Sequence, residues 1–269
     1  MACKNAYVNI AEAIEAAKKM SMFEKPKKEA VLTNSLVFGV DSRFSAEDIL
    51  QNNITMFEWV SRNKLRPNFW IRNIAGENAL TKQEIKFLHK KGCKIGLLYS
   101  SADAKETEIH GKTLAQKVSD AATKIDVPGG TAIFIEIEET EKTTKEFLAG
   151  FIGELALSGY YPAFKVNTDA RYIFDREFSR GMQMNEQLFS KCIIWAVSPS
   201  LKEYDGMTTT HFIHPDEWKP FAPSCITRED IAVWQYGKDC HPINNDNGLR
   251  TSFNLNLVRN ERVITKLMY

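Results

Sequence analysis

The chain lacks an excess of either charge: 35 Lys and Arg residues against 34 Asp and Glu residues give a net charge of +1 over 269 residues. Bulk charge therefore gives no reason to expect a nucleic acid or an anionic membrane surface as a partner. No stretch approaches the roughly 18 consecutive apolar residues of a transmembrane helix, so no membrane span is predicted. No Gly-x-Gly-x-x-Gly or Gly-Lys-Thr/Ser motif follows a predicted strand, which argues against a nucleotide-binding open sheet.

Cysteine is also sparse, with five residues and no Cys-x-x-Cys spacing: Cys3, Cys93, Cys192, Cys225 and Cys240. The odd number excludes a complete disulfide framework, and the spacing argues against a zinc site. Cys93 and Cys192 lie in apolar runs and are predicted to be buried free thiols, which favours a reducing compartment. His211 and His214 are interpreted as a surface pair beside Pro215 rather than a metal site, and no cofactor is expected.

The first 33 residues are predicted to form a helical appendage ahead of a single domain over residues 34–269. Residues 11–20 are amphipathic and contain Glu12, Glu15 and Lys18, where a secretion signal needs an uninterrupted apolar core. With no visible signal peptide, we expect a cytoplasmic protein or one that is released or exported by a non-classical route. The sequence does not predict the oligomeric state.

Eight segments have the pattern of strands: residues 36–41, 67–73, 94–99, 130–140, 161–167, 191–197, 231–236 and 253–257. Helical patterns occupy residues 45–63, 81–92, 110–124, 143–157 and 185–190 between them. This alternation predicts an α/β fold, a (β/α)₈ TIM-like barrel. The last two strands have no helical pattern between them, so the barrel is expected to be irregular there. A doubly wound open sheet is the rival architecture.

The fourth predicted strand contains a pair of acids on one face. Alternation along this strand puts the side chains of Ile133, Ile135 and Ile137 on one face. The side chains of Phe134, Glu136 and Glu138 are on the other face. The Cα atoms of the two glutamates are then roughly 6.6 Å apart, which is close to the spacing of paired acids that act on a glycosidic bond. The simpler interpretation is an edge strand with a solvated acidic face.

Polar and aromatic residues also end the other predicted strands: Asp41, Asn73, Tyr99, Lys165, Asn167, Trp195, Trp234, Gln235, Tyr236 and Asn254. The carboxyl ends of barrel strands are where such folds place their active sites. Polar groups buried at these positions without partners would cost several kcal/mol, so a ring of them indicates a ligand site. The tryptophans and tyrosines suit stacking on sugar rings.

These residues resemble a known family. Residues 39–41, 94–99, 136–138, 195–196, 234–236 and 253–256 match, in order, short pieces of the family 25 glycoside hydrolases, the muramidase-type lysozymes with a barrel fold. The resemblance runs from about residue 37 to residue 257. It is closest to the related glycoside-hydrolase-like domains of unknown function.

The resemblance implies a lysozyme-like hydrolase of β-linked amino sugars, with a polysaccharide or peptidoglycan fragment as its partner. Glu138 would be the general acid, and Glu136 and Asp41 would hold charge and orient the substrate. The residues implied to bind substrate are Asn73, Tyr99, Lys165, Asn167, Trp195, Trp234, Gln235, Tyr236 and Asn254.

Three positions depart from the family pattern. Glu136 stands in place of the usual aspartate, Asn254 in place of an aspartate, and Lys165 in place of a common tyrosine. Loss of the aspartate charge at position 254 removes a group that would help to raise the pKa of a nearby acid. A catalytically weak or inactive barrel that binds a glycan or a protein partner is therefore the alternative, and a barrel enzyme of another class is the third hypothesis.

Overall fold

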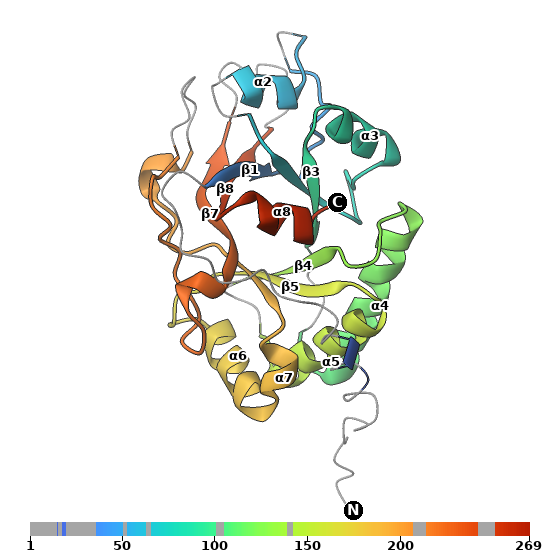
Figure 1. The fold of residues 1–269 in the computed structure, drawn as a ribbon, viewed down its shortest axis with the longest axis vertical. Helices are drawn as coiled ribbons and strands as arrows, with labels where there is room; N and C mark the ends of the chain where they lie inside the picture. Colours follow the sequence, from blue (N-terminus) through green and yellow to red (C-terminus); the bar gives the residue numbers. More distant parts are fainter. Residues whose placement is uncertain are drawn as a thin grey trace, which may run out of the picture.

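Eight strands close into a barrel in which neighbours along the chain are neighbours in space, β1 to β8 in order (Figure 1). The computed structural model describes residues 36–50, 53–62, 66–100, 105–138, 142–206, 214–241 and 251–269, together with Glu15, Lys18 and Lys19. The predicted barrel is therefore confirmed. The predicted appendage of residues 1–33 lies outside the described residues except for Glu15, Lys18 and Lys19.

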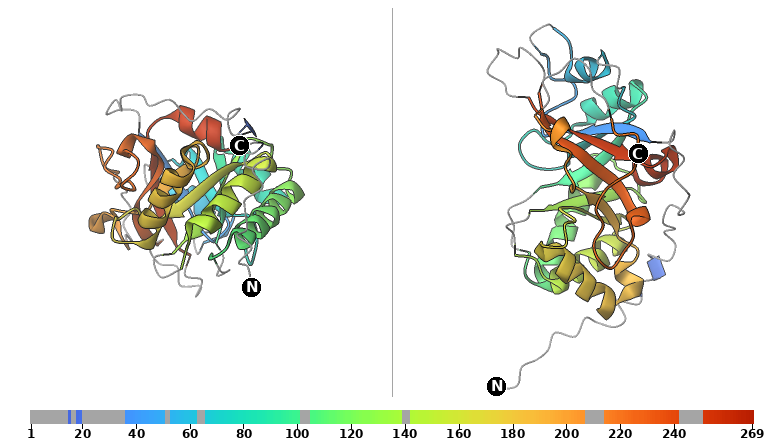
Figure 2. Two further views of the ribbon diagram at one scale, coloured as in Figure 1. Left: turned by 90° about the horizontal axis from the view of Figure 1, so that it is seen from below. Right: turned by 90° about the vertical axis from the view of Figure 1, so that its left-hand side faces the viewer.

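The strands are β1 (Val37–Asp41), β2 (Phe69–Asn73), β3 (Lys94–Tyr99), β4 (Ala132–Ile137), β5 (Tyr161–Val166), β6 (Ile193–Ala196), β7 (Ile231–Cys240) and β8 (Phe253–Val258). The helices are α2 (Met56–Arg62), α3 (Lys82–Lys90), α4 (Glu108–Lys124), α5 (Lys145–Leu157), α6 (Ile173–Met184), α7 (Glu186–Phe189) and α8 (Glu261–Leu267), with 3₁₀ turns η1 (Lys202–Tyr204) and η2 (Arg228–Asp230). The helices α2 and α3 lie on one side of the barrel, and α5, α6 and α7 lie on the opposite side (Figures 1 and 2).

The irregular end of the barrel is at β8. This strand pairs antiparallel with both β7 and β1, whereas all other pairs are parallel. A strand that reverses direction needs no crossover helix, which agrees with the missing helical pattern before it. The helix α8 then closes the amino-terminal end of the barrel, where Val263 and Leu267 share a buried cluster with Val37 and Val258.

The side chains of the strands divide into two buried layers. Ile133, Ile135 and Ile137 of β4 belong to the layer between the sheet and the helices. Phe134 belongs to the second cluster, inside the barrel, where its ring lies 5.4 Å from that of Trp195. The predicted alternation of β4 is confirmed, and it directs Glu136 to the same side as Phe134.

Some helix predictions were wrong. Residues 45–63 were predicted as one helix, but α2 begins only at Met56. Ser45 and Asp48 make a local turn instead, in which the Ser45 N–H donates to Asp48 Oδ2 at 3.1 Å and the Asp48 N–H donates to the Ser45 carbonyl at 3.1 Å. Asn53 then has a φ of 53°, which no helix continues through. The helices α6 and α8 were not predicted.

Cys93 and Cys192 are buried free thiols, as predicted. No helix among the described residues is long and apolar enough to cross a membrane. In the same part of the chain, no group of three or more His, Cys, Asp and Glu side chains is placed to hold a metal ion. His211 lies outside the described residues.

Candidate functional site

A cavity of about 410 Å³ opens at the carboxyl ends of β1 to β5, beside the start of β8. This is the end at which barrels of this kind hold their ligands. The cavity is lined almost entirely by polar groups, namely Asp41, Ser42, Arg43, Asn73, Ala75, Gly76, Glu77, Asn78, Leu98, Ser100, Glu136, Glu138, Lys165 and Asn254. Six of the residues singled out from the sequence are therefore brought together: Asp41, Asn73, Glu136, Glu138, Lys165 and Asn254.

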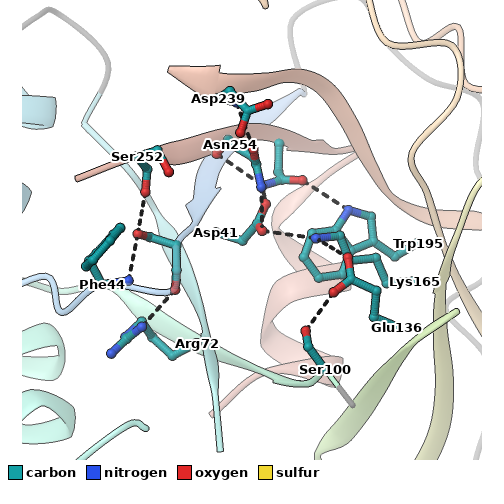
Figure 3. A network of polar contacts seen from close by, with 12 residues as sticks. Asp41, Phe44, Arg72, Ser100, Glu136, Lys165, Trp195, Asp239, Ser252 and Asn254 are labelled. Carbon is teal, nitrogen blue, oxygen red and sulfur yellow. Dashed lines mark hydrogen bonds and ion pairs between the residues drawn. The ribbon is translucent and has the colours of Figure 1, made fainter. Parts of the chain in front are cut away.

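Asp41 ends β1 and is a buried hydrogen-bond acceptor. Its Oδ2 accepts from Lys165 Nζ at 3.2 Å and from Asn254 Nδ2 at 2.9 Å, and its Oδ1 accepts from Asn256 Nδ2 at 2.7 Å (Figure 3). Three donors on one carboxylate fix the position of both of its oxygens. Asp41 is also opposite Asn254 in the strand register, which explains how these side chains meet.

Glu136 is held by two donors, Ser100 just after the end of β3 and Lys165 on β5. Its Oε1 lies 3.1 Å from Lys165 Nζ, and its Oε2 accepts from Ser100 Oγ at 2.6 Å. Burial raises the pKa of Glu136, but Lys165, Ser100 and Arg43 together bring its pKa below the ordinary value. Glu136 is therefore a carboxylate near neutral pH, suited to stabilise positive charge rather than to donate a proton.

Lys165 is the buried cation between the two carboxylates. Burial alone would lower its pKa, but Asp41 and Glu136 hold its pKa above the usual value, so the ammonium stays charged. The Nζ lies 4.6 Å from the centre of the Trp195 ring, a cation–π distance. Lys165 thus forms the floor of the cavity, with Trp195 beneath it.

Glu138 lies beyond the last residue of β4 and lines the same cavity, and it is exposed. It is two residues after Glu136 on the same face of the chain. The more accessible of the two glutamates is therefore the one that the sequence resemblance implies to be the acid.

A buried ion pair ties two loops of the cavity rim together. Arg72 Nε donates to Glu84 Oε1 at 2.8 Å, and both side chains are 1% exposed. The guanidinium also donates to the carbonyls of Ser42 at 2.8 Å and Asn78 at 2.7 Å, and both of these residues line the cavity. Glu84 Oε1 in turn accepts the N–H of Ala46 at 2.8 Å.

The structure corrects the positions of three aromatic residues. Tyr99, Trp234 and Tyr236 were expected to line the groove, but they belong to the buried layer outside the barrel wall. Trp234 Nε1 donates to the Pro199 carbonyl at 3.1 Å, and the Tyr236 ring packs against Tyr204. The reason is strand alternation: Trp234 and Tyr236 share one face of β7, and Gln235 has the other.

Three further predicted residues lie outside the set that lines the cavity. Trp195 is inside the barrel but fully buried, with Nε1 donating to Asn256 Oδ1 at 3.0 Å, so it supports the site from below. Gln235 is also buried, and among the described residues its Oε1 finds no hydrogen-bond partner. Asn167 accepts the Asp169 N–H at 3.0 Å through its Oδ1, within its own loop.

Asn256, Ser100 and Arg43 were not predicted as site residues. Asn256 is fully buried and bridges Asp41 to Trp195. The sequence places it two residues after Asn254 on the same strand face, among the polar residues at the strand ends, but assigns it no role. Ser100 and Arg43 follow the ends of β3 and β1 and carry no pattern of their own.

No protein-family model matches the chain, and no curated protein matches it. One similar solved structure is the crystal structure of an uncharacterized B. stearothermophilus protein, which is 24% identical in sequence and has a TM-score of 0.70. The match covers 87% of this chain and 100% of that chain. The two chains share the barrel fold.

Two other solved structures are more distant in shape. The modular autolysin LytC from Streptococcus pneumoniae is 12% identical with a TM-score of 0.48, covering 82% of this chain and 46% of that chain. A family GH25 lysozyme from Aspergillus fumigatus is 13% identical with a TM-score of 0.43, covering 83% of this chain and 94% of that chain.

Proposed function

We propose that the protein is a glycoside hydrolase that cleaves β-linked amino sugars, with peptidoglycan as its substrate. The observation that carries this proposal is the gathering of Asp41, Glu136 and Glu138 around one cavity at the carboxyl ends of the strands. The substrate class rests on the sequence resemblance to the family 25 glycoside hydrolases.

Two carboxyl groups in different environments can divide the work on a glycosidic bond. Glu138, the exposed acid, protonates the leaving oxygen as the bond to the anomeric carbon breaks. Glu136, which is held charged by Lys165 and Ser100, stabilises the positive charge that develops on the sugar ring. Water then adds to the anomeric carbon and returns a proton to Glu138. Asp41 is assigned no part in proton transfer, since both of its oxygens are already engaged by three hydrogen-bond donors.

A glycan-binding barrel without hydrolytic activity is the second candidate function. The observation that favours it is the pairing of both Asp41 and Glu136 with a single buried ammonium. A polar cavity of this kind binds hydroxyl groups through fixed donors and acceptors whether or not a bond is cleaved.

The test is incubation with purified peptidoglycan, followed by analysis of the released muropeptides. We expect release by the wild type and a loss of about 10²–10⁴-fold in Glu138→Gln, because the amide cannot deliver a proton. Affinity for peptidoglycan fragments is expected to persist in that variant. Glu77→Gln is the matched control, since Glu77 lines the same cavity and has no assigned role.

The two candidate functions give different results in this assay. Release that is lost in Glu138→Gln and kept in Glu77→Gln supports the hydrolase. Fragment binding without release, in the wild type and both variants, rejects the hydrolase in favour of the binding barrel. Equal release by the wild type and Glu138→Gln removes Glu138 from the mechanism.

A further inference from the structure

The ammonium of Lys165 is enclosed by groups from three strands and is only 5% exposed as a residue. It lies 3.2 Å from Asp41 Oδ2 on β1 and 3.1 Å from Glu136 Oε1 on β4, and it sits over the face of Trp195 on β6 (Figure 3). Lys165 and Glu136 are direct partners in the register of β4 and β5. The two strands are parallel, and residues in register point to the same face of the sheet, so the pairing of the strands sets this contact.

This cluster contains two carboxylates and one ammonium, so it is stable only if every charge is well compensated. The neutral partners supply the remaining donors. Asn254 and Asn256 donate to Asp41, and Ser100 donates to Glu136. All of the partners named here donate to the two carboxylates, and none of them competes as an acceptor.

We propose that Lys165 is a positioning residue whose buried ammonium bridges Asp41 and Glu136, keeps Glu136 charged and fixes the direction of the Glu136 carboxylate, which leaves proton transfer in the cavity to Glu138. The other charged groups in the same cavity are Arg43 from the segment after β1, which also lowers the pKa of Glu136, Glu77 from the segment after β2, and Glu138. Arg43 is exposed, so its influence is screened by solvent, whereas Lys165 acts inside the barrel wall. Only the kinetic arm of the test rests on the proposed function.

The first test is a carboxyl-carbon NMR titration of Glu136 in the full chain. In the wild type we expect Glu136 to titrate below its ordinary value of 4.5. In Lys165→Met, which keeps most of the length of the side chain and removes its charge, the pKa of Glu136 is expected to rise. Ser100→Ala is the matched control, because it removes the other donor to Glu136 and is expected to give a smaller rise.

The second test uses chemical rescue. Lys165→Ala removes the side chain beyond Cβ, and propylammonium has the size and charge of the missing atoms. We expect turnover of peptidoglycan to fall about 10²-fold in kcat, the scale of one lost electrostatic contact, with a smaller change in KM. Added propylammonium is expected to restore part of the rate and to lower the pKa of Glu136 again, whereas neutral propanol is not.

The proposal is overturned if the pKa of Glu136 in the wild type is 4.5 or higher. It is also overturned if the pKa of Glu136 is the same in Lys165→Met as in the wild type. If the wild type does not cleave peptidoglycan, the proposed function fails and the titration alone decides the role of Lys165. If neither Lys165 variant folds, Ser100→Ala decides. In Ser100→Ala, Lys165 must still keep the pKa of Glu136 below 4.5, and a higher pKa in this variant overturns the proposal.

Discussion

The side-chain amide of Asn254 connects Asp41 to the β7–β8 hairpin: its Nδ2 donates to Asp41 Oδ2 at 2.9 Å, and its Oδ1 accepts the Asp239 N–H at 3.0 Å. Both ends of the amide are used, so its orientation is fixed by its neighbours. An aspartate at this position could accept from Asp239 but would present a second acceptor to Asp41. The amide of Asn254 therefore matches both of its neighbours, as a donor to Asp41 and an acceptor from Asp239.

We expect Asn254→Asp to lower the free energy of unfolding by about 1–3 kcal/mol near neutral pH, because a donor is lost and two carboxylates meet. It is not expected to raise the rate of glycan cleavage. Urea unfolding of Asn254→Asp and Asn254→Ala separates the two causes, since alanine removes the donor without adding charge. If the two variants are equally stable, the like-charge repulsion from Asp41 is absent and this explanation of Asn254 is wrong.

A second prediction concerns Trp234, which packs outside the barrel wall and is fully buried. Trp234→Ala is expected to destabilise the fold by about 3–5 kcal/mol through the cavity that it leaves. Glycan affinity of the folded fraction should be unchanged, since the side chain does not line the site. Thermal unfolding and fragment binding measure these two effects. Trp195→Phe is the comparison variant, because Trp195 packs against Lys165 and donates a hydrogen bond to Asn256. Loss of the indole should therefore lower glycan affinity.

The case of Trp234 shows what the sequence can and cannot supply. Alternation located the strands and paired Glu136 with Phe134 on one face, because period-2 patterning is local. On β7, however, Trp234, Gln235 and Tyr236 were all expected at the site, although alternation lets only one face of a strand point into the barrel. Which face points inward depends on how the strand sits against its partners, and the register shifts on both sides of β7 show that this is set by the whole barrel.

The ion pair between Lys165 and Glu136 illustrates the same limit. Both residues were selected from the sequence as site residues, but their contact depends on the register of β4 and β5. The error at residues 45–63 has a different origin. The Ser45 and Asp48 pattern serves equally well as a helix start or as an isolated turn, and only the backbone after it, with Asn53 at a positive φ, distinguishes them.

A third prediction follows from the shifted pKa values. The pKa of Glu136 is lowered by folding, so its contribution to stability is present above about pH 4.5 and is lost as the pH falls through its folded value. The pKa of Lys165 is raised, so its contribution is present below pH 10.5 and is lost as the pH rises through its folded value. Urea unfolding across pH 3–7 should show the loss of stability at acid pH, whereas the loss of the Lys165 contribution begins only above pH 10.5. In Glu136→Gln, the free energy of unfolding should fall less as the pH is lowered. An equal fall in the wild type and in this variant would contradict the assignment.

The last prediction concerns the buried pair of Arg72 and Glu84 behind the cavity rim. Arg72→Met leaves Glu84 charged and unpaired in the interior, and the expected loss of stability is about 3–5 kcal/mol. The double variant Arg72→Met/Glu84→Met is expected to lose much less than the sum of the two single variants, because no unpaired charge remains. A double-mutant cycle by urea unfolding measures this coupling.

The matched control lies on the same helix, α3. Lys82 and Asp126 form an ion pair whose side chains are 56% and 77% exposed, and Lys82→Met is expected to change the free energy of unfolding by less than about 1 kcal/mol.

In the double variant Arg72→Met/Glu84→Met, the carbonyls of Ser42 and Asn78 lose their shared donor even if stability recovers. Glycan affinity should therefore stay reduced while the unfolding free energy returns toward the wild-type value. Full recovery of affinity together with stability would show that the two loops hold their positions without Arg72.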